Sequence, residues 1–331
     1  MTGAFSDPSF VAALVAELEQ GRPVALASLL ATRGSMPRHA GARLAVLADG
    51  SLQGTVGGGN VERIAEARAR ALLTGSAAPQ IEWLTHEENE MACGGDALLA
   101  VRLLTAEDLP AFAVLADALE AGATAMAEED WSDPAAPALS VTCGGKPVPR
   151  TSWDEETHRY VEPIAAPSTC HIFGAGHVGR ALAALLPPIG FMVAIYDDRP
   201  EALDAAALPE GALASCGSFE DLADAAPIGH RDSVVVLTHG HAADEAVLVR
   251  VLTRAEQPAY VGCIGSRRKA ALVRDRLVAA GVARERAGAV HLPIGEDILA
   301  VTPQEIAVSI AAQLIRCRAE RRNAREGGRP C

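Results

Sequence analysis

The stretch His171-Ile-Phe-Gly-Ala-Gly-His-Val-Gly179 decides the fold of the second half of this 331-residue chain. A short apolar run enters a Gly-x-Gly-x-x-Gly pattern, and a helical pattern follows at once. In a dinucleotide-binding fold the first glycine makes a tight turn, the second admits a pyrophosphate to the backbone, and the third lets the helix pack closely on the strand. The N-terminus of that helix also favours an anion. The pattern predicts a dinucleotide site at Gly174, Gly176, His177, Val178 and Gly179.

Beyond residue 166, strand patterns alternate with helical patterns. Strands are predicted at 169–173, 192–196, 233–238 and 259–264, and helices at 178–186, 244–254 and 267–280. Such alternation indicates right-handed crossovers and a parallel sheet. We therefore predict that residues 167–331 form a Rossmann-like, doubly wound parallel-sheet domain for nucleotide binding, with a C-terminal helix and a basic tail.

Polar residues after the other strands complete the predicted dinucleotide site. Asp197 and Asp198 end the strand that follows roughly 20 residues on, where a carboxylate can hydrogen-bond a ribose diol. His239 is expected to line the crevice beyond its own strand, and Gly265-Ser266 offers either a second anion-binding turn or an ordinary helix cap. Since Arg199 can contact a ribose phosphate, both NAD and NADP stay open as ligands.

Residues 1–166 are expected to form a separate mixed α/β domain, in which 105–166 is interpreted as a connecting region. Strands are predicted at 24–31, 43–47, 81–84 and 97–104, and helices at 8–20, 61–73 and 105–122. Residues 123–166 show only short strand-like pieces rich in proline and glycine. The pattern changes at 165–167, which is the predicted domain boundary.

Three features of the first half favour a ligand site. A basic turn spans 33–43, and the glycine-rich stretch 54–60 offers backbone N–H groups that can line an anion cradle, with Asn60 as the expected N-cap of the next helix. The segment 91–95 places a thiol beside two glycines, and sulfur suits a soft metal centre. Each feature also has an ordinary interpretation, as a turn or a small buried thiol. The predicted cofactor-binding residues are Arg33, Ser35, Arg38, Arg43, Gly57, Gly58, Gly59, Asn60, Glu62, Cys93, Gly94 and Gly95.

Composition argues against several classes of protein. The net charge of −13 disfavours nucleic-acid binding, which requires a basic face. No apolar run approaches the length of about 18 residues that spans a membrane, and the first residues lack the basic region of a secretory signal. Seven cysteines without a Cys-x-x-Cys pair favour neither a disulfide framework nor a zinc site. We expect a soluble cytoplasmic protein that binds neither nucleic acid nor membrane.

Together these motifs resemble those of the XdhC/CoxI family, the xanthine dehydrogenase accessory proteins. The first half carries Arg33-Gly-Ser-Met-Pro-Arg38, Gly54-Thr-Val-Gly-Gly-Gly59 and Met91-Ala-Cys-Gly-Gly95. The second half carries the glycine pattern, Asp197-Asp-Arg199, Tyr260-Val-Gly-Cys-Ile-Gly-Ser-Arg-Arg-Lys269 and Thr302-Pro-Gln-Glu-Ile-Ala-Val-Ser309. The resemblance covers nearly the whole chain in the right order, so it is more specific than any single motif.

The resemblance implies an accessory chaperone more than a turnover enzyme. Members of the family bind the molybdenum cofactor, a molybdopterin, assist its sulfuration and insert it into xanthine dehydrogenase or a related molybdenum hydroxylase. A cysteine desulfurase is the second implied partner, and Cys93 is the implied contact to molybdenum. We also expect a homodimer. Two positions depart from the family pattern: Asn60 replaces a cysteine of many relatives, and Leu299 replaces a common glycine.

Two other functions stay open on the residues alone. An NAD(P)-dependent oxidoreductase could use His177, His239 or His241 as an acid or base, although no Tyr-x-x-x-Lys signature accompanies the glycines. A nucleotide-sensing scaffold would bind NAD(P) without turnover. A His-x-His-x-Asp metal site is not favoured, because Asp244 comes one residue too late after the two histidines.

Overall fold

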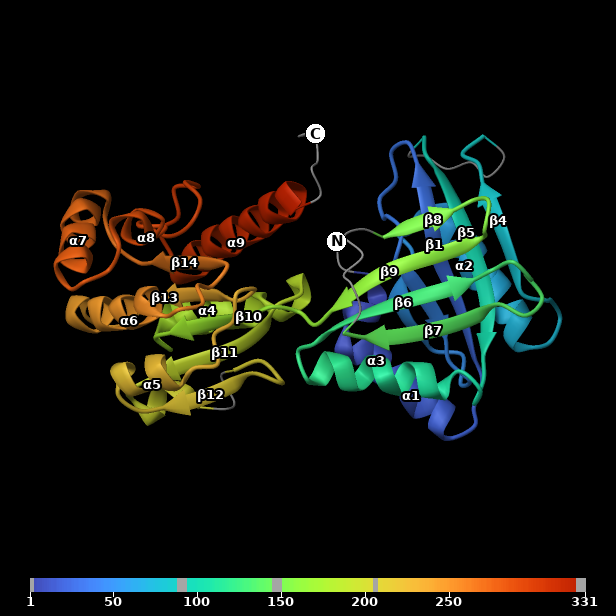
Figure 1. Cartoon of the computed structure of the whole chain (residues 1–331), viewed down its shortest axis with the longest axis horizontal. Coiled ribbons are helices and arrows are strands. Elements are labelled where there is room, and N and C mark those ends of the chain that lie inside the picture. The colour runs from blue at the N-terminus through green and yellow to red at the C-terminus, as the bar shows by residue number, and fades with distance from the viewer. Residues whose placement is uncertain (1–2, 88–93, 145–150, 205–207, 326–331) are drawn as a thin grey trace. The chain divides into compact units, whose positions relative to one another are not determined.

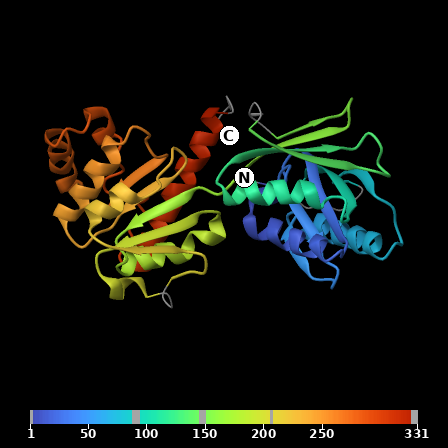
Figure 2. The same ribbon diagram turned by 60° about the horizontal axis from the view of Figure 1, so that its bottom comes forward.

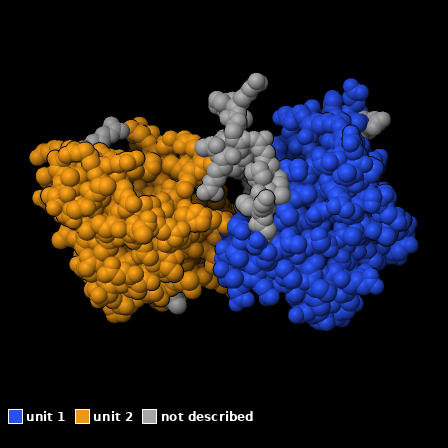
Figure 3. All heavy atoms as spheres, viewed as in Figure 1, with its two compact units in different colours: residues 1–166 blue, residues 167–331 orange. Residues whose placement is uncertain are grey.

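The computed structural model describes residues 3–87, 94–144, 151–204 and 208–325. The chain divides into two compact units, residues 1–166 (unit 1) and residues 167–331 (unit 2), as Figures 1 and 3 show. None of the helices within the described ranges is long and apolar enough to cross a membrane.

Unit 2 is built on five parallel strands in the order β12-β11-β10-β13-β14. Every residue of β13 and β14 is buried, because helices cover both faces of a parallel sheet. The predicted Rossmann-like parallel sheet is confirmed. Its elements are β10 (Thr169–Phe173), α4 (His177–Leu185), β11 (Met192–Asp197), β12 (Leu213–Cys216), α5 (Phe219–Ala225), β13 (Ser233–Val236), α6 (His241–Thr253), β14 (Tyr260–Cys263), α7 (Arg267–Ala279), α8 (Arg284–Gly288) and α9 (Pro303–Arg325), with 3-10 turns at Pro187–Ile189 and Pro200–Leu203.

The two faces of this sheet have separate apolar cores. Ile172 of β10 packs in one core with Leu182 of α4 and Ile310 of α9. The next residue, Phe173, packs in the other core with Val247 of α6. This alternation is the expected consequence of the two-residue repeat of a strand. The parallel pairing of the strands places the carboxyl ends of β10, β11, β13 and β14 along one edge of the sheet.

The edge strand β12 and the short helix α5 were not predicted. All four residues of β12 are exposed, so its sequence lacks the apolar pattern that identifies a strand. Helix α5 has seven residues, which is too short for a helical repeat to stand out.

Unit 1 holds an antiparallel sheet in the order β3-β2-β1-β5-β4 and a second antiparallel sheet in the order β7-β6-β9-β8. A 3-10 turn at Ala4–Ser6 precedes them. The elements are α1 (Pro8–Glu19), β1 (Val24–Arg33), β2 (Arg43–Val46), β3 (Leu52–Thr55), α2 (Gly59–Leu73), β4 (Gln80–Leu84), β5 (Asp96–Leu104), α3 (Leu109–Glu120), β6 (Thr124–Asp130), β7 (Ala138–Cys143), β8 (Ser152–Asp154) and β9 (Arg159–Ala165).

Helix α2 packs on one face of the first sheet. Its Val61, Ala65 and Ala69 recur at helical spacing and contact a core that contains Ala27 and Leu44 of β1 and β2. On the other face, α1 and α3 lie side by side (Figures 1 and 2) and share a core with the second sheet. The first sheet therefore fixes the N-terminus of α2 and the loops that flank it.

The second sheet corrects the interpretation of 105–166 as a connecting region. Trp131, which follows β6, and Tyr160 of β9 are fully buried against Leu30 and Leu98 of the first sheet. Residues of this segment therefore belong to the interior of unit 1. The proline- and glycine-rich composition marked the turns of the sheet and hid its strands.

Leu299, in the turn before α9, has a backbone φ of +59°. This left-handed conformation favours glycine, because a side chain crowds the following carbonyl group. Leu299 is also 87% exposed, so its side chain contributes little packing in return. The conformation gives a physical reason for the glycine that the family pattern places here.

Candidate functional site

Two of the predicted loops of unit 1 meet backbone to backbone. A Cβ added to Gly95 would lie 2.5 Å from the carbonyl oxygen of Ser35 and 2.7 Å from that of Arg33. A Cβ on Gly34, whose φ is +70°, would lie 3.2 Å from the oxygen of Gly94. Glycine is thus required where the two segments touch. Cys93 lies outside the described residues, so its predicted contact to molybdenum stays a prediction.

The glycine-rich turn before α2 lies against a third predicted residue, Arg38. A Cβ on Gly57 would come within 2.9 Å of Cγ of Arg38. Gly58 and Gly59 have positive φ values, and a Cβ on either would meet no atom within 4 Å. The backbone of this turn therefore faces open space beside an arginine.

The N-cap prediction for α2 is wrong. The helix begins at Gly59 and its N-cap is Gly58, which has a φ of +79°. Asn60 lies inside the first turn, where its side-chain oxygen accepts a hydrogen bond from Nε of Arg63 at 2.9 Å. Three successive glycines, all with positive φ, let the chain enter the helix along a path that other residues rarely adopt.

Glu62 occupies the anion cradle that the glycine-rich stretch was expected to offer to a ligand. Its Oε2 accepts hydrogen bonds from the amides of Val56 at 3.1 Å, Gly57 at 3.1 Å and Gly58 at 3.0 Å, and from the hydroxyl of Thr55. Burial opposes ionisation of Glu62, but these four donors outweigh it and lower its pKa. The cradle exists, and the anion inside it belongs to the chain itself.

Arg33 remains at the surface of this region. Its guanidinium stacks 4.0 Å from the ring centroid of Trp83 and pairs with Glu155 at 2.5 Å, and both members of the pair are exposed. Ser35 is exposed as well. An exposed guanidinium held on an aromatic ring can still offer donors to an anionic ligand.

The prediction of Arg43 as a cofactor-binding residue does not fit its position at the start of β2. Its side chain is fully buried, and its guanidinium pairs with Glu162 at 2.7 Å and Glu129 at 2.9 Å. The ring of Phe5 lies 3.5 Å from the guanidinium carbon. Burial alone would lower the pKa of Arg43, but the neighbouring acids raise it. Burial raises the pKa of Glu162, although Arg43 partly offsets this. Arg43 ties the two sheets of unit 1 together.

A histidine that no sequence motif indicates adjoins this region. Nδ1 of His86 lies 2.9 Å from the carboxylate of Asp96, which also accepts a hydrogen bond from the His86 amide. Asp96 pairs in register with Arg33 at the ends of β5 and β1. The hydrogen bond with Asp96 raises the pKa of His86. The pairing of β1 with β5 is the signal that could have located His86, because it brings Asp96, the partner of His86, beside Arg33.

In unit 2, the glycines of the fingerprint behave as their pattern predicts. A Cβ on Gly174 would lie 2.2 Å from the oxygen of Leu237, and one on Gly179 would lie 1.9 Å from the oxygen of Gly174. A Cβ on Gly176 would meet nothing within 4 Å. His177 begins α4 and Val178 follows in its first turn. The first and third glycines thus permit close packing, and the second faces open space.

The first acid after β11 has an internal role. Asp197 is fully buried, and its carboxylate accepts hydrogen bonds from the Ala175 amide at 2.7 Å and from Nε of Arg199 at 2.8 Å. Burial opposes its ionisation, but these bonds outweigh burial and lower its pKa. The carboxylate of Asp197 therefore holds the glycine loop in place, which corrects its expected role as the ribose acceptor.

The second acid, Asp198, pairs across the sheet with His239. Nε2 of His239 lies 2.9 Å and 3.2 Å from the two carboxylate oxygens. Asp198 follows β11 and His239 follows β13, and β10 with its glycine loop lies between these strands. The ring of Phe219 stands 5.9 Å from that of His239. Both residues remain partly exposed.

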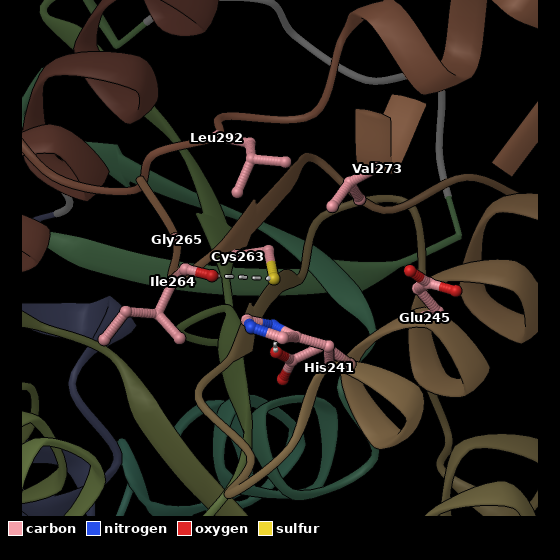
Figure 4. Close-up of a pocket in the computed structure, with 8 residues that line it drawn as sticks. His241, Glu245, Cys263, Ile264, Gly265, Val273 and Leu292 are labelled. Atoms are coloured by element: carbon pink, nitrogen blue, oxygen red, sulfur yellow. Dashed lines mark hydrogen bonds and ion pairs between the residues drawn. The ribbon is translucent and has the colours of Figure 1, made fainter. Parts of the chain in front are cut away.

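A small pocket opens beyond the carboxyl ends of β13 and β14 (Figure 4). Asp244 is buried there and accepts a hydrogen bond from the Thr238 hydroxyl at 2.6 Å. Burial raises the pKa of Asp244 despite this bond. Burial also raises the pKa of Cys263, whose thiol donates to the Ile264 carbonyl at 3.4 Å (Figure 4). A protonated thiol is a weak nucleophile and a poor metal ligand.

One of the two remaining predicted residues of unit 2 lines this pocket. Gly265 lines it, and Ser266 is the N-cap of α7 but makes no capping hydrogen bond through its side chain. Among the residues that the structure describes, no group of three or more histidine, cysteine or acidic side chains is placed to hold a metal ion.

Comparison with known proteins covers both units. Residues 17–82 match the XdhC and CoxI family, and residues 170–314 match the XdhC Rossmann domain. The uncharacterized protein YqeB of Escherichia coli K12 is 31% identical over 300 residues, which are 90% of this chain but 44% of YqeB. The chain thus spans less than half of that relative.

Two further relatives match over nearly their whole length. A Bacillus subtilis protein named as a probable xanthine dehydrogenase subunit is 24% identical over 94% of this chain and 98% of its own. A solved structure from Bacillus halodurans, described as a xanthine dehydrogenase, covers 97% of both chains with a TM-score of 0.79 and 20% identity. At that identity the similarity shows a shared fold for the chain.

Proposed function

This chain belongs to the XdhC and CoxI family, and from that premise we propose that it is an accessory protein of a xanthine dehydrogenase or a related molybdenum hydroxylase. In this role it binds the molybdenum cofactor in unit 1, assists its sulfuration and delivers it to the hydroxylase. The names of the relatives from the two Bacillus species support the association with xanthine dehydrogenase.

The observation that carries the cofactor proposal is the convergence of three loops in unit 1. Gly95 touches Ser35, and Gly57 touches Arg38. These contacts bring the arginine-bearing turn, the open backbone of Gly58 and the segment next to Cys93 into one region of unit 1. The described residues there fit the phosphate end of a molybdopterin, because guanidinium groups match phosphate oxygens in charge and geometry.

Several roles follow from the proposal. Arg33 and Arg38 would bind the phosphate, and Gly58 and Gly94 would let the ligand approach the backbone. Arg43, Glu62 and Asn60 would support the site without contacting the ligand, because their side chains already bond within the chain. Cys93 would contribute the thiol. A cysteine desulfurase as sulfur donor, a homodimer and a cytoplasmic location belong to the same proposal.

The test is metal and pterin analysis of the full chain purified from a host that makes molybdenum cofactor. The wild-type protein is expected to carry molybdenum and pterin in equal amounts. Arg38→Ala and Cys93→Ala are expected to lose most of both, whereas Arg70→Ala, an exposed arginine on α2 paired with Glu66, is expected to keep them. Wild-type protein without molybdenum would overturn the proposal, and full loading of both variants would overturn the site.

A further inference from the structure

The sheet of unit 2 has its topological switch point between β10 and β13. The chain runs outward from β10 through β11 to β12 and then returns to β13 on the other side of β10. In open α/β sheets ligands bind at this point, beyond the carboxyl ends of the strands. Here that place holds the glycine loop 174–179, with the Asp198–His239 pair reaching across it.

The glycine loop is already shaped for close approach of a ligand. Gly174 and Gly179 are packed so tightly that no side chain fits at either position. The buried carboxylate of Asp197 holds the amide of Ala175 between them. Gly176 alone of the three faces open space. A phosphate group can therefore approach the backbone at Gly176, beside the N-terminus of α4.

Asp198 is the acid that can reach a ligand in this crevice. Its side chain is 35% exposed and lies 3.7 Å from Nε of Arg199, whereas that of Asp197 is fully buried and lies 2.8 Å from the same nitrogen. Both oxygens of Asp198 already contact Nε2 of His239. A ribose diol needs the same oxygens as acceptors. Binding of a ribose to Asp198 therefore competes with the hydrogen bond between Asp198 and His239.

Local charge distinguishes between the two common dinucleotides. Arg199 is the cation next to Asp197 and Asp198, and the carboxylate of Glu201 also acts on it. Three acids against one arginine give this end of the crevice a negative balance. A 2′-phosphate would meet like charge there, and like charge strongly disfavours a partner. A free diol would instead find an acceptor.

We propose that the crevice of unit 2 binds an adenine dinucleotide with an unphosphorylated ribose, whose diol is accepted by Asp198 after His239 releases it. The Asp198–His239 pair then acts as a latch over the glycine loop. This inference goes beyond the cofactor site of unit 1 and does not depend on it.

The test is calorimetric titration of the full chain with NADH and with NADPH. NADH is expected to bind, and NADPH at least about tenfold more weakly. Asp198→Asn is expected to weaken NADH binding by about 10- to 100-fold, the range for a lost hydrogen bond to a charged group. His239→Ala is expected to strengthen it by about two- to fivefold, because an exposed pair no longer competes. Asp224→Asn, at an exposed acid of α5, is the matched control and should bind as wild type.

Weaker NADH binding by Asp198→Asn together with stronger NADH binding by His239→Ala supports the proposal. No binding of NADH, equal binding of NADPH, an unchanged Asp198→Asn variant or a His239→Ala variant as weak as Asp198→Asn would each overturn it. If Asp198→Asn fails to fold, the NADH-to-NADPH ratio and the His239→Ala result still decide. Molybdenum and pterin content, measured on the same protein, reports on unit 1, so failure of one proposal is distinguishable from failure of the other.

Discussion

Replacing Glu62 with glutamine is expected to loosen the glycine-rich turn in front of α2. One oxygen of Glu62 accepts from three backbone amides and from the Thr55 hydroxyl. Glutamine keeps an acceptor oxygen but loses the charge, and a neutral hydrogen bond is about half as strong as a charge-assisted one. Because the bonds share one oxygen and the side chain is partly exposed, we expect a total loss of about 2 kcal/mol. For a unit of this size, that loss lowers the melting temperature by about 4–8 °C.

The effect of Glu62→Gln also has a definite pH dependence. The pKa of Glu62 is lowered in the folded protein from an ordinary value of 4.5. A carboxylate of this kind stabilises the fold above its unfolded pKa, and the stabilisation is lost as the pH falls through the folded pKa. The difference between wild type and variant should therefore be constant near neutral pH and shrink below about pH 4.5.

Thermal unfolding followed by circular dichroism measures both effects. Glu66→Gln is the matched control, because Glu66 lies one turn further along α2 in an exposed pair with Arg70 and should cost less than about 0.5 kcal/mol. A Glu62→Gln variant as stable as this control at pH 7 would refute the reasoning. A difference that persists unchanged at pH 3 would refute it as well. Lower molybdenum content in Glu62→Gln would further show that the turn shapes the ligand region.

Three further predictions concern stability. Arg43→Met should destabilise unit 1 by about 3–5 kcal/mol in chemical denaturation, because the buried carboxylates of Glu129 and Glu162 lose their cation; a loss below about 1 kcal/mol would contradict this. Gly174→Ala should lower the free energy of unfolding by at least about 2 kcal/mol and abolish NADH binding, because its Cβ would lie 2.2 Å from a carbonyl oxygen. Wild-type affinity of this variant for NADH in calorimetry would contradict the prediction. Leu299→Gly should raise the melting temperature slightly, by the equivalent of up to about 1 kcal/mol, and a lower value would show that the exposed leucine has a packing partner.

The sequence was most informative where one physical requirement determined the residues. Buried strands of the parallel sheet are mostly apolar, so the sequence predicts β10, β11, β13 and β14 close to their observed bounds. The exposed strand β12 has no such requirement and was not found. The first and third glycines of the fingerprint were predicted for the same reason, since no other residue fits there.

Charged residues were harder to place, because a sequence does not show which charge meets which. Arg43 looked like a ligand residue, although its partners Glu129 and Glu162 lie more than 80 residues away in the chain. The sequence predicts the anion cradle and assigns Glu62 as a ligand contact, whereas in the structure Glu62 is itself the anion in the cradle. Asp197 and Asp198 are adjacent in sequence, and only the fold separates the buried acid from the accessible one.

The buried charge of Arg43 sets a minimum length for a fragment of unit 1 that can fold. The segment that matches the XdhC and CoxI family ends at residue 82, yet both counter-charges of Arg43 lie beyond it, in β6 and β9. A fragment ending at residue 82, or even at the close of the first sheet, would place a guanidinium in an apolar interior without a carboxylate. We therefore expect any piece of unit 1 that folds alone to extend at least through Glu162. The segment that matches the family is therefore shorter than the segment that must fold together.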